Sequence, residues 1–302
     1  MTPTEIQEKL NRKFPPSGKF EYIQEVWLHY WEYLPKNYNA SIHNTVVMIH
    51  GLSGSLNDFL YSYDLMNELK KHFRIILIDR PGAGYSYITN GKTFTLENQI
   101  DVIKELLSRL QVTNPIIVGH SLGGALTLNF AALHPEYEAR YVLLAPLIYT
   151  VWLMNFPFLF LLKIKLVSSF IFRIILWVQN IFFHQLIRNA FRPNAELLQK
   201  DYESITKDQL SSWPQLNAEF TNLVTVKNSI MKNQHLYKEI KMQVSILVGK
   251  NDKIIPAEKQ AKKLLNENNR FKLHLYSRCG HMINFAKPTD IVMEIVNISM
   301  VK

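Results

Sequence analysis

The sequence predicts an α/β fold with a mostly parallel central sheet, flanked by helices and interrupted by an inserted helical cap. Short apolar segments alternate with helical patterns along two stretches of the chain, as in consecutive βαβ units. This alternation stops between 146 and 242, where the sequence reads as helical. The length of 302 residues, of which 47% are hydrophobic and 20% charged, is enough to bury one sizeable core.

The chain therefore divides into a core and an insertion. We expect a polar N-terminal segment at 1–18, an α/β core built from 19–145 together with 243–302, and a helical cap (lid) at 146–242. In parallel sheets of this kind, the loops at the carboxyl ends of the strands border the functional site. A cap inserted into such a loop would cover that site.

The core elements follow from hydrophobic spacing. Buried parallel strands read as short continuous apolar runs, and helices as apolar residues three and four positions apart. Two early strands that pair antiparallel are expected within 20–34. Further strands are expected at 45–50, 73–79, 115–120, 141–145, 244–249 and 271–276. Helices are expected at 57–72, 95–110 and 256–268, and from Ser121 and Pro288 onward.

The segment IIVGHSLGG places a serine, Ser121, between two glycines where an apolar strand must turn into a helix. In such a G-x-S-x-G elbow the serine has a strained backbone and presents its hydroxyl at the top of the sheet. Gly119 and Gly123 are needed where side chains would collide across the turn, with His120 and Leu122 flanking the serine. Ser121 is therefore the candidate nucleophile. A Gly/Ser loop without chemistry is the alternative.

Two later segments supply the partners that a serine nucleophile requires. Asp252, in SILVGKNDKIIP, lies just beyond an expected strand end, and His281, in LYSRCGHMINF, lies in a glycine-flanked loop after the last expected strand. The order Ser, Asp, His along the chain is that of a nucleophile, an orienting acid and a base on an α/β sheet. These three residues are predicted to form a catalytic triad.

Acyl transfer also needs hydrogen-bond donors for the oxyanion. The backbone N–H groups of Leu122 and Leu52 are the expected donors, Leu52 because the segment HGLSGS forms a glycine-rich bend after the strand 45–50. His50 and Gly51 are expected to support this bend. His120 is expected to be structural because it points away from the elbow.

Five segments, MIHGLSGS, LIDRPGAGYS, VGHSLGG, LVGKND and RCGH, occur in this order. Together they resemble the α/β-hydrolase superfamily, in particular serine esterase or lipase-like members with a helical cap. The resemblance implies Ser121 as nucleophile, Asp252 as acid and His281 as base, and the residues 79–82 as a supporting turn. Lys287 departs from many relatives, which carry an acid there.

The predicted activity is hydrolysis of a carboxylic ester, small or lipophilic (monoacylglycerol or carboxylester type), through an acyl-enzyme on Ser121. A carbon–carbon hydrolase, a haloperoxidase-like enzyme or a lyase with the same triad stays open, because fold does not determine function. A non-catalytic ligand-binding protein is a further alternative.

Cys279 as a thiol nucleophile is disfavoured, because no elbow lowers its pKa. We expect no metal and no cofactor, since a triad and an oxyanion hole suffice.

The net charge is +9, but it is unevenly placed. Between 139 and 195 there is no Asp or Glu, whereas six basic residues occur there: Arg140, Lys163, Lys165, Arg173, Arg188 and Arg192. Because this segment is strongly apolar, its charges favour a membrane surface over phosphates. No basic run with a glycine-aromatic pattern is present, so nucleic acid is excluded as a partner.

The apolar run Val151–Phe183 is interrupted by Lys163, Lys165 and Arg173, which argues against a membrane span. It is expected to lie in a membrane interface or to pack as a lid on the core.

The polar N-terminus shows no secretory signal, and a single cysteine is typical of a reducing compartment. We therefore expect a cytoplasmic protein with peripheral membrane contact through 151–183.

Overall fold

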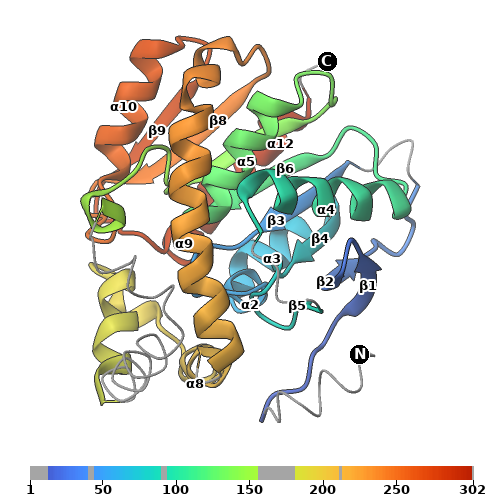
Figure 1. Cartoon of the computed structure of the whole chain (residues 1–302), viewed down its shortest axis with the longest axis vertical. Coiled ribbons are helices and arrows are strands. Elements are labelled where there is room, and N and C mark those ends of the chain that lie inside the picture. Colours follow the sequence, from blue (N-terminus) through green and yellow to red (C-terminus); the bar gives the residue numbers. More distant parts are fainter. Residues whose placement is uncertain (1–12, 40–43, 90–93, 156–180, 211–212, 301–302) are drawn as a thin grey trace.

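The computed structural model describes residues 13–39, 44–89, 94–155, 181–210 and 213–300. Within these ranges nine strands form one sheet, in the order β1-β2-β4-β3-β6-β7-β8-β9, with β5 beside β2 (Figure 1). The strands are β1 (Lys19–Ile23), β2 (Val26–Tyr33), β3 (Thr45–Ile49), β4 (Arg74–Ile78), β5 (Tyr87–Ile88), β6 (Ile116–His120), β7 (Arg140–Leu144), β8 (Val244–Gly249) and β9 (Lys272–Tyr276).

The sheet is mostly parallel, which confirms the predicted fold class. β1 and β2 pair antiparallel with each other, and β2 pairs antiparallel with β4 and β5. From β4 onward every pairing is parallel. Every residue of β3, β4 and β6 is buried, as expected of central strands that are covered on both faces.

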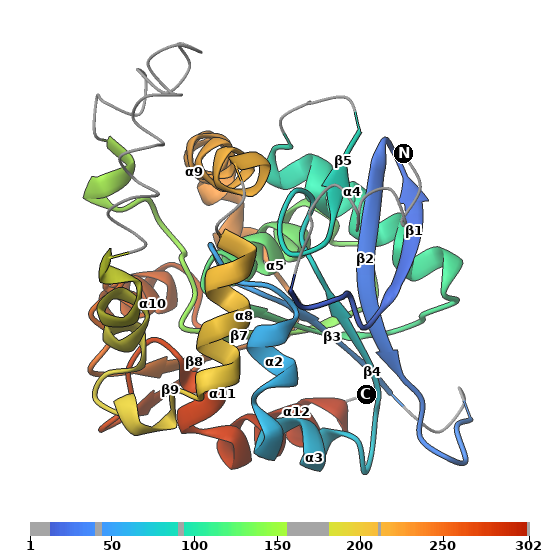
Figure 2. The same cartoon turned by 90° about the horizontal axis from the view of Figure 1, so that it is seen from below.

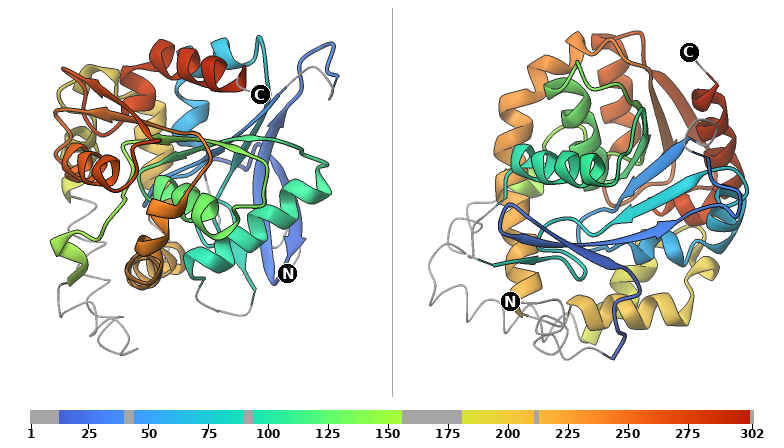
Figure 3. Two further views of the ribbon diagram at one scale, coloured as in Figure 1. Left: turned by 90° about the horizontal axis from the view of Figure 1, so that it is seen from above. Right: turned by 90° about the vertical axis from the view of Figure 1, so that its right-hand side faces the viewer.

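Helices cover both faces of the sheet. α4 (Leu96–Arg109), α5 (Leu122–Leu133) and α10 (Ala257–Glu267) contribute to one hydrophobic cluster. α3 (Tyr63–Leu69) and α12 (Pro288–Ser299) contribute to a second cluster. Figures 2 and 3 show these two layers with the sheet between them. The carboxyl ends of the parallel strands are thereby left for loops that carry the candidate site.

The prediction of a single helix at 57–72 is wrong, because the helix is interrupted. The structure has two helices here, α2 (Asn57–Leu60) and α3, separated at Ser62. Ser62 leaves the helical conformation (ψ 70°), and its hydroxyl donates to the carbonyl oxygen of Asn284. This acceptor precedes α12 in a short helix that was not predicted, α11 (Ile283–Ala286). A hydrogen bond between residues so distant in sequence produces no local sequence pattern that could predict the interruption.

The described parts of the segment between β7 and β8 are mostly helical, with turns and irregular residues between the helices. It contains η1 (Trp152–Asn155), a helix at residues 181–191, η2 (Ala195–Leu197), α8 (Lys200–Leu210), α9 (Trp213–Asn233) and η3 (Gln234–Glu239). α9 is fixed to α4 because Ser229 and Asn233 donate hydrogen bonds to the carboxylate of Glu97, at 2.6 and 3.0 Å. Figure 1 shows α9 extending from there past the sheet towards α8.

No helix in the described parts of the chain combines the length and apolar character that crossing a membrane requires. Most of the run 151–183, for which an interfacial or lid position was expected, lies outside the described residues. The expectation of membrane contact therefore stays a prediction.

Candidate active site

Ser121 lies between β6 and α5 with φ 53° and ψ −113°, a conformation that non-glycine residues seldom adopt. The glycines around it allow the sharp turn. A Cβ on Gly119 would lie 2.2 Å from the carbonyl oxygen of Gly123, and a Cβ on Gly123 would lie 2.2 Å from that of Ile49. The Ser121 N–H donates to Leu144 O at 2.9 Å, which holds the strained residue in place.

The three residues predicted as a triad lie together. His281 Nε2 lies 3.0 Å from Ser121 Oγ, and His281 Nδ1 lies 2.8 Å from Asp252 Oδ2. The other carboxylate oxygen of Asp252 accepts hydrogen bonds from the N–H groups of Ile254 and Ile255, at 2.8 and 3.1 Å. The acid is therefore held in orientation, and the imidazole can accept the serine proton while donating its own Nδ1–H to the carboxylate.

The topology explains why residues so distant in sequence meet. Ser121 follows β6, Asp252 follows β8 and His281 follows β9, and these strands are parallel. The carboxyl ends of parallel strands lie at one edge of a sheet, so the three loops converge there. Two backbone bonds also join the later loops, from Lys250 N to Tyr276 O and from Asn251 N to Cys279 O, both 2.9 Å.

One expected oxyanion donor follows the serine in the chain, and the other follows Gly51, a residue that lies against the serine. Leu122 is the first residue of α5, so its N–H is one of the helix-terminal amides that have no acceptor within the helix. Leu52 lies in the turn after β3 and is 38% exposed. The preceding residue, Gly51, lies against the nucleophile, since a Cβ built on it would be 3.0 Å from Ser121 Cβ. This arrangement can present two N–H groups to one oxygen.

His50 is fully buried and holds the turn after β3, the supporting position expected for it. The backbone N–H of Arg80 donates to His50 Nε2 at 3.0 Å, and His50 Nδ1 donates to Gly51 O at 2.8 Å. Burial lowers the pKa of His50 to about 3, and the nearby Arg80 charge acts in the same direction. Both ring nitrogens of this neutral imidazole are engaged in hydrogen bonds, so neither is free to accept a proton from a nucleophile.

His120 is also buried, and it contacts the candidate base. Its Nε2 lies 2.9 Å from the carbonyl oxygen of His281. Burial lowers the pKa of His120 to about 3, with the neighbouring His281 contributing in the same direction. His120 is therefore neutral, and it links the nucleophile elbow to the loop that carries His281.

The expected supporting turn at 79–82 is built on a buried carboxylate. Asp79 Oδ2 lies 2.7 Å from His29 Nδ1 and accepts from Tyr85 N at 2.8 Å, while Oδ1 accepts from Leu56 N at 2.7 Å. Burial raises the pKa of Asp79, but these donors outweigh it and hold the pKa below its usual value. An ionised carboxylate thus ties β2 and the start of α2 to the end of β4.

Cys279 is fully buried, and burial raises the pKa of its thiol to about 12. It stays protonated at neutral pH, so it does not offer a thiolate nucleophile. Within the described ranges, no cluster of three or more His, Cys, Asp or Glu side chains could hold a metal ion.

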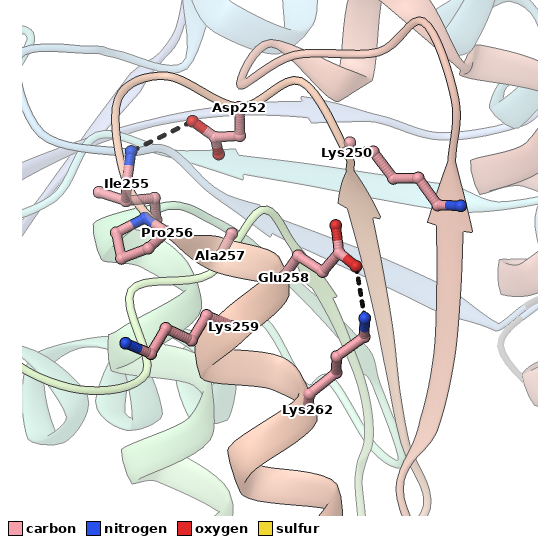
Figure 4. Close-up of a pocket in the computed structure, with 9 residues that line it drawn as sticks. Lys250, Asp252, Ile255, Pro256, Ala257, Glu258, Lys259 and Lys262 are labelled. Atoms are coloured by element: carbon pink, nitrogen blue, oxygen red, sulfur yellow. Dashed lines mark hydrogen bonds and ion pairs between the residues drawn. The ribbon is translucent and has the colours of Figure 1, made fainter.

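A surface groove of about 400 Å³ lies beside Asp252 (Figure 4). It is lined by the end of β8 and the start of α10, including Lys250, Lys259 and Lys262. Asp252 itself lines the groove, whereas the candidate nucleophile, Ser121, and the candidate base, His281, do not.

One buried residue at the site, Glu219 of α9, was missed by the sequence analysis. Its carboxylate accepts from Ser53 N at 3.0 Å and lies 3.3 Å from an Nη atom of Arg80. Glu219 belongs to no motif, and an isolated acid on a helix is usually solvated. No sequence signal could have placed it beside the turn after β3.

Curated relatives match most of the chain. The chain is 22% identical over 264 residues to a 2-hydroxy-6-oxo-2,4-heptadienoate hydrolase of Pseudomonas putida, covering 81% of this chain and 84% of the relative. It is 24% identical over 306 residues to a 2-hydroxy-6-oxo-6-phenylhexa-2,4-dienoate hydrolase of Comamonas testosteroni, covering 95% of this chain and 96% of the relative.

Solved structures share the fold. The crystal structure of an enol-lactonase from Burkholderia xenovorans superposes with a TM-score of 0.72 at 16% sequence identity, covering 94% of this chain and 100% of that one. A sequence profile of the alpha/beta hydrolase fold matches residues 44–288, which span all three loops of the candidate site. The chain belongs to the alpha/beta hydrolase fold family.

Proposed function

We propose that the protein is a serine hydrolase that cleaves a carboxylic ester through an acyl-enzyme on Ser121. The observation that carries this proposal is the unbroken sequence of contacts from Ser121 Oγ to His281 Nε2, at 3.0 Å, and from His281 Nδ1 to Asp252 Oδ2, at 2.8 Å. Such contacts activate a hydroxyl that is otherwise a weak nucleophile.

In the first half-reaction, Ser121 Oγ attacks the ester carbonyl carbon while His281 Nε2 takes the hydroxyl proton. The carbonyl oxygen becomes an oxyanion and is bound by the N–H groups of Leu52 and Leu122. When the tetrahedral adduct collapses, the bond to the alkoxy oxygen breaks and His281 gives its proton to the leaving alcohol. Asp252 stabilises the imidazolium that exists between these two transfers.

In the second half-reaction, water takes the place of the alcohol. His281 accepts a proton from the water as its oxygen attacks the acyl carbon. Collapse of the second adduct releases the carboxylic acid and returns a proton to Ser121 Oγ. The balance is ester plus water giving acid plus alcohol.

The second candidate is a carbon–carbon hydrolase, and the two curated relatives favour it. Both are named as hydrolases of 2-hydroxy-6-oxo-dienoates. Such compounds contain no ester, so their hydrolysis must break a carbon–carbon bond beside the 6-oxo group. Identity of 22% and 24% does not decide between the two substrates, because one fold hosts many chemistries.

A substrate panel tests the proposal. Purified protein is assayed with p-nitrophenyl esters of increasing acyl length, with monoacylglycerols and with a 2-hydroxy-6-oxo-dienoate, beside a Ser121→Ala variant. We expect ester turnover that falls by on the order of 10³-fold or more in the variant. Dienoate cleavage without ester turnover would assign the second candidate, and equal ester turnover by the variant would exclude Ser121 as the nucleophile.

A covalent probe separates an enzyme from a ligand-binding protein. A fluorophosphonate reacts much faster with an activated serine than with an ordinary hydroxyl, forming a bond from Ser121 Oγ to phosphorus as fluoride leaves. Labelling of the wild type, but not of Ser121→Ala, supports a hydrolytic serine. If the folded wild type is not labelled, the proposed mechanism is wrong.

In this proposal residues 146–242 act as a cap that admits a lipophilic ester from a membrane surface. Four large apolar side chains on either side of the undescribed stretch are more than half exposed: Trp152, Ile181, Phe182 and Leu186. Exposed apolar side chains near basic ones are typical of interfacial binding. Lys163, Lys165 and Arg173, the basic residues of this prediction, lie outside the described residues.

Flotation with vesicles containing phosphatidylserine tests this membrane contact. We expect the wild type to float with the vesicles and a Lys163→Glu/Lys165→Glu/Arg173→Glu variant to stay below, because charge reversal repels anionic headgroups. If neither protein floats, the segment serves as a lid without membrane contact.

A further inference from the structure

Glu219, on α9 of the cap, reaches the turn that follows β3 in the core. Its Oε2 accepts a hydrogen bond from the N–H of Ser53 at 3.0 Å, and its Oε1 lies 3.3 Å from an Nη atom of Arg80. Arg80 is fully buried and Glu219 is 4% exposed. The cap thus contacts the turn that carries the expected oxyanion donor, Leu52, through a buried carboxylate.

The same Nη of Arg80 donates to the carbonyl oxygen of Gly51 at 2.9 Å, and His50 Nδ1 donates to that oxygen at 2.8 Å. Gly51 C=O and Leu52 N–H belong to one peptide group. Because a trans peptide is planar, its C=O and N–H point in opposite directions. Two donors that hold the Gly51 oxygen therefore also determine where the Leu52 N–H points.

The peptide group on the other side of Leu52 is held by the cap. Its N–H is that of Ser53, which donates to Glu219. Ser53 has φ 58°, a left-handed conformation that a non-glycine residue keeps only when its surroundings hold it. Both peptide groups that flank Leu52 thus depend on Arg80 or Glu219, and these two side chains also contact each other.

Burying the Glu219 carboxylate and the Arg80 guanidinium together costs free energy of desolvation. Burial raises the pKa of Glu219 above its ordinary value, although the Arg80 charge and the Ser53 N–H act in the opposite direction. Buried ion pairs commonly contribute little net stability, because desolvation cancels most of their attraction. A gain in the geometry of the turn is therefore a better account of this pair than a gain in folding free energy.

We propose that Glu219 is a positioning residue of the hydrolytic site, which orients the Leu52 N–H through Ser53 and Arg80 and makes the oxyanion hole dependent on the docked cap. This inference rests on the proposed function, in which Leu52 binds the oxyanion. It assigns to the cap a role in stabilising the transition state in addition to covering the substrate.

The first test uses a fluorophosphonate, whose phosphoryl oxygen takes the oxyanion position without any assumption about the substrate. The rate constant for labelling of Ser121 is compared among the wild type, Glu219→Ala, Glu219→Gln and Glu203→Gln. Glu203 is the control, because it also lies in the cap and its carboxylate pairs with the exposed side chain of His184. Misfolded protein lowers the end point of labelling, whereas the rate constant reports the folded site.

We expect Glu219→Ala to label about 10- to 100-fold more slowly than the wild type, because loss or misplacement of one oxyanion donor has effects of this order. Glu219→Gln keeps an oxygen acceptor for Ser53 N–H but loses the charge facing Arg80, so its rate should lie between those two. Glu203→Gln should label at the wild-type rate.

The second test is steady-state ester hydrolysis by the same variants. A positioning role predicts that kcat falls by about 10- to 100-fold for Glu219→Ala while KM stays nearly constant, because the contact acts on the transition state. Equal labelling rates in wild type and Glu219→Ala, or a change in KM alone, would overturn the inference and leave the proposed function intact. An unlabelled wild type would instead overturn the proposed function.

Discussion

The imidazole Nε2 of His120 lies 2.9 Å from the backbone carbonyl oxygen of His281, and the two ring centroids are 4.9 Å apart. His120 precedes the candidate nucleophile in the chain, so the elbow and the loop of the candidate base are joined directly. Because the pKa of His120 is lowered to about 3, mainly by burial, its ring is neutral and donates one hydrogen bond from Nε2. The bond holds the backbone from which the His281 side chain extends.

Replacing His120 by Phe should impair catalysis. The substitution keeps a flat ring but removes the donor, so the His281 carbonyl loses its partner and the loop can shift. We expect kcat to fall by roughly tenfold, since small displacements of catalytic groups have effects of that order or larger. Ester hydrolysis by His120→Phe, compared with the exposed control His72→Phe, measures this. Equal kcat values for His120→Phe and the wild type would contradict it.

Acid should destabilise the fold through its buried histidines. Burial lowers the pKa values of His50 and His120 to about 3, whereas an unfolded chain binds these protons near pH 6.5. Between these values the unfolded state holds more protons, so the free energy of unfolding falls as the pH falls, by about 1.4 kcal/mol per unit for each group. Asp58 has the opposite effect and offsets the contribution of one histidine. Burial raises its pKa to about 7, so the folded state binds this proton more readily than the unfolded state.

The measurement is urea unfolding at about pH 6.5 and about pH 5 for the wild type and for His120→Gln. The variant lacks one of the two buried histidines, so its loss of stability on acidification should be smaller by roughly 2 kcal/mol over this interval. Identical pH dependence in both proteins would mean that His120 binds a proton in the folded state.

Replacing Asp252 by Asn should leave the fold intact but abolish most activity. The N–H groups of Ile254 and Ile255 bind one carboxylate oxygen, so the amide oxygen of Asn takes that place and its NH₂ faces His281 Nδ1. His281 then carries its proton on Nε2 and cannot accept one from Ser121. We expect kcat to fall on the order of 10³- to 10⁴-fold.

Circular dichroism and kcat for Asp252→Asn and for the exposed control Asp64→Asn check this prediction. The control should behave as the wild type in both measurements. Undiminished turnover by Asp252→Asn would show that the acid has no part in the reaction.

Two glycines beside Ser121, one in the elbow and one in the turn after β3, should differ in how well they tolerate a side chain. A Cβ on Gly123 would lie 2.2 Å from the carbonyl oxygen of Ile49, so β3 and α5 must separate to admit it. A Cβ on Gly51 would lie 3.0 Å from Ser121 Cβ, which a smaller shift relieves. We expect Gly123→Ala to lose about 2–3 kcal/mol of unfolding free energy, a usual cost of overpacking.

Gly51→Ala should lose less stability and more of its kcat, because the shift falls on the nucleophile. Urea unfolding and ester hydrolysis of both variants test the contrast. If Gly123→Ala is as stable as the wild type, the close approach of α5 to β3 is not required.

The sequence alone was sufficient for most of the fold. Strands β3, β4 and β6 are buried on both faces and therefore appear in the sequence as short continuous apolar runs. The chain order of Ser121, Asp252 and His281, each just past a strand end, also predicted which side chains would meet. Those predictions depend on local patterns and on one general rule, that the carboxyl ends of parallel strands share an edge.

Only the tertiary structure determined the contacts between segments that are distant in sequence. The helix expected at 57–72 divides at Ser62 because its hydroxyl binds Asn284, and Glu219 reaches Ser53 because α9 docks across the core. Neither residue stands in a local pattern, since a single serine or glutamate on a helix reads as solvent-facing. Their roles come from desolvation and from partners more than a hundred positions away, which hydrophobic spacing does not encode.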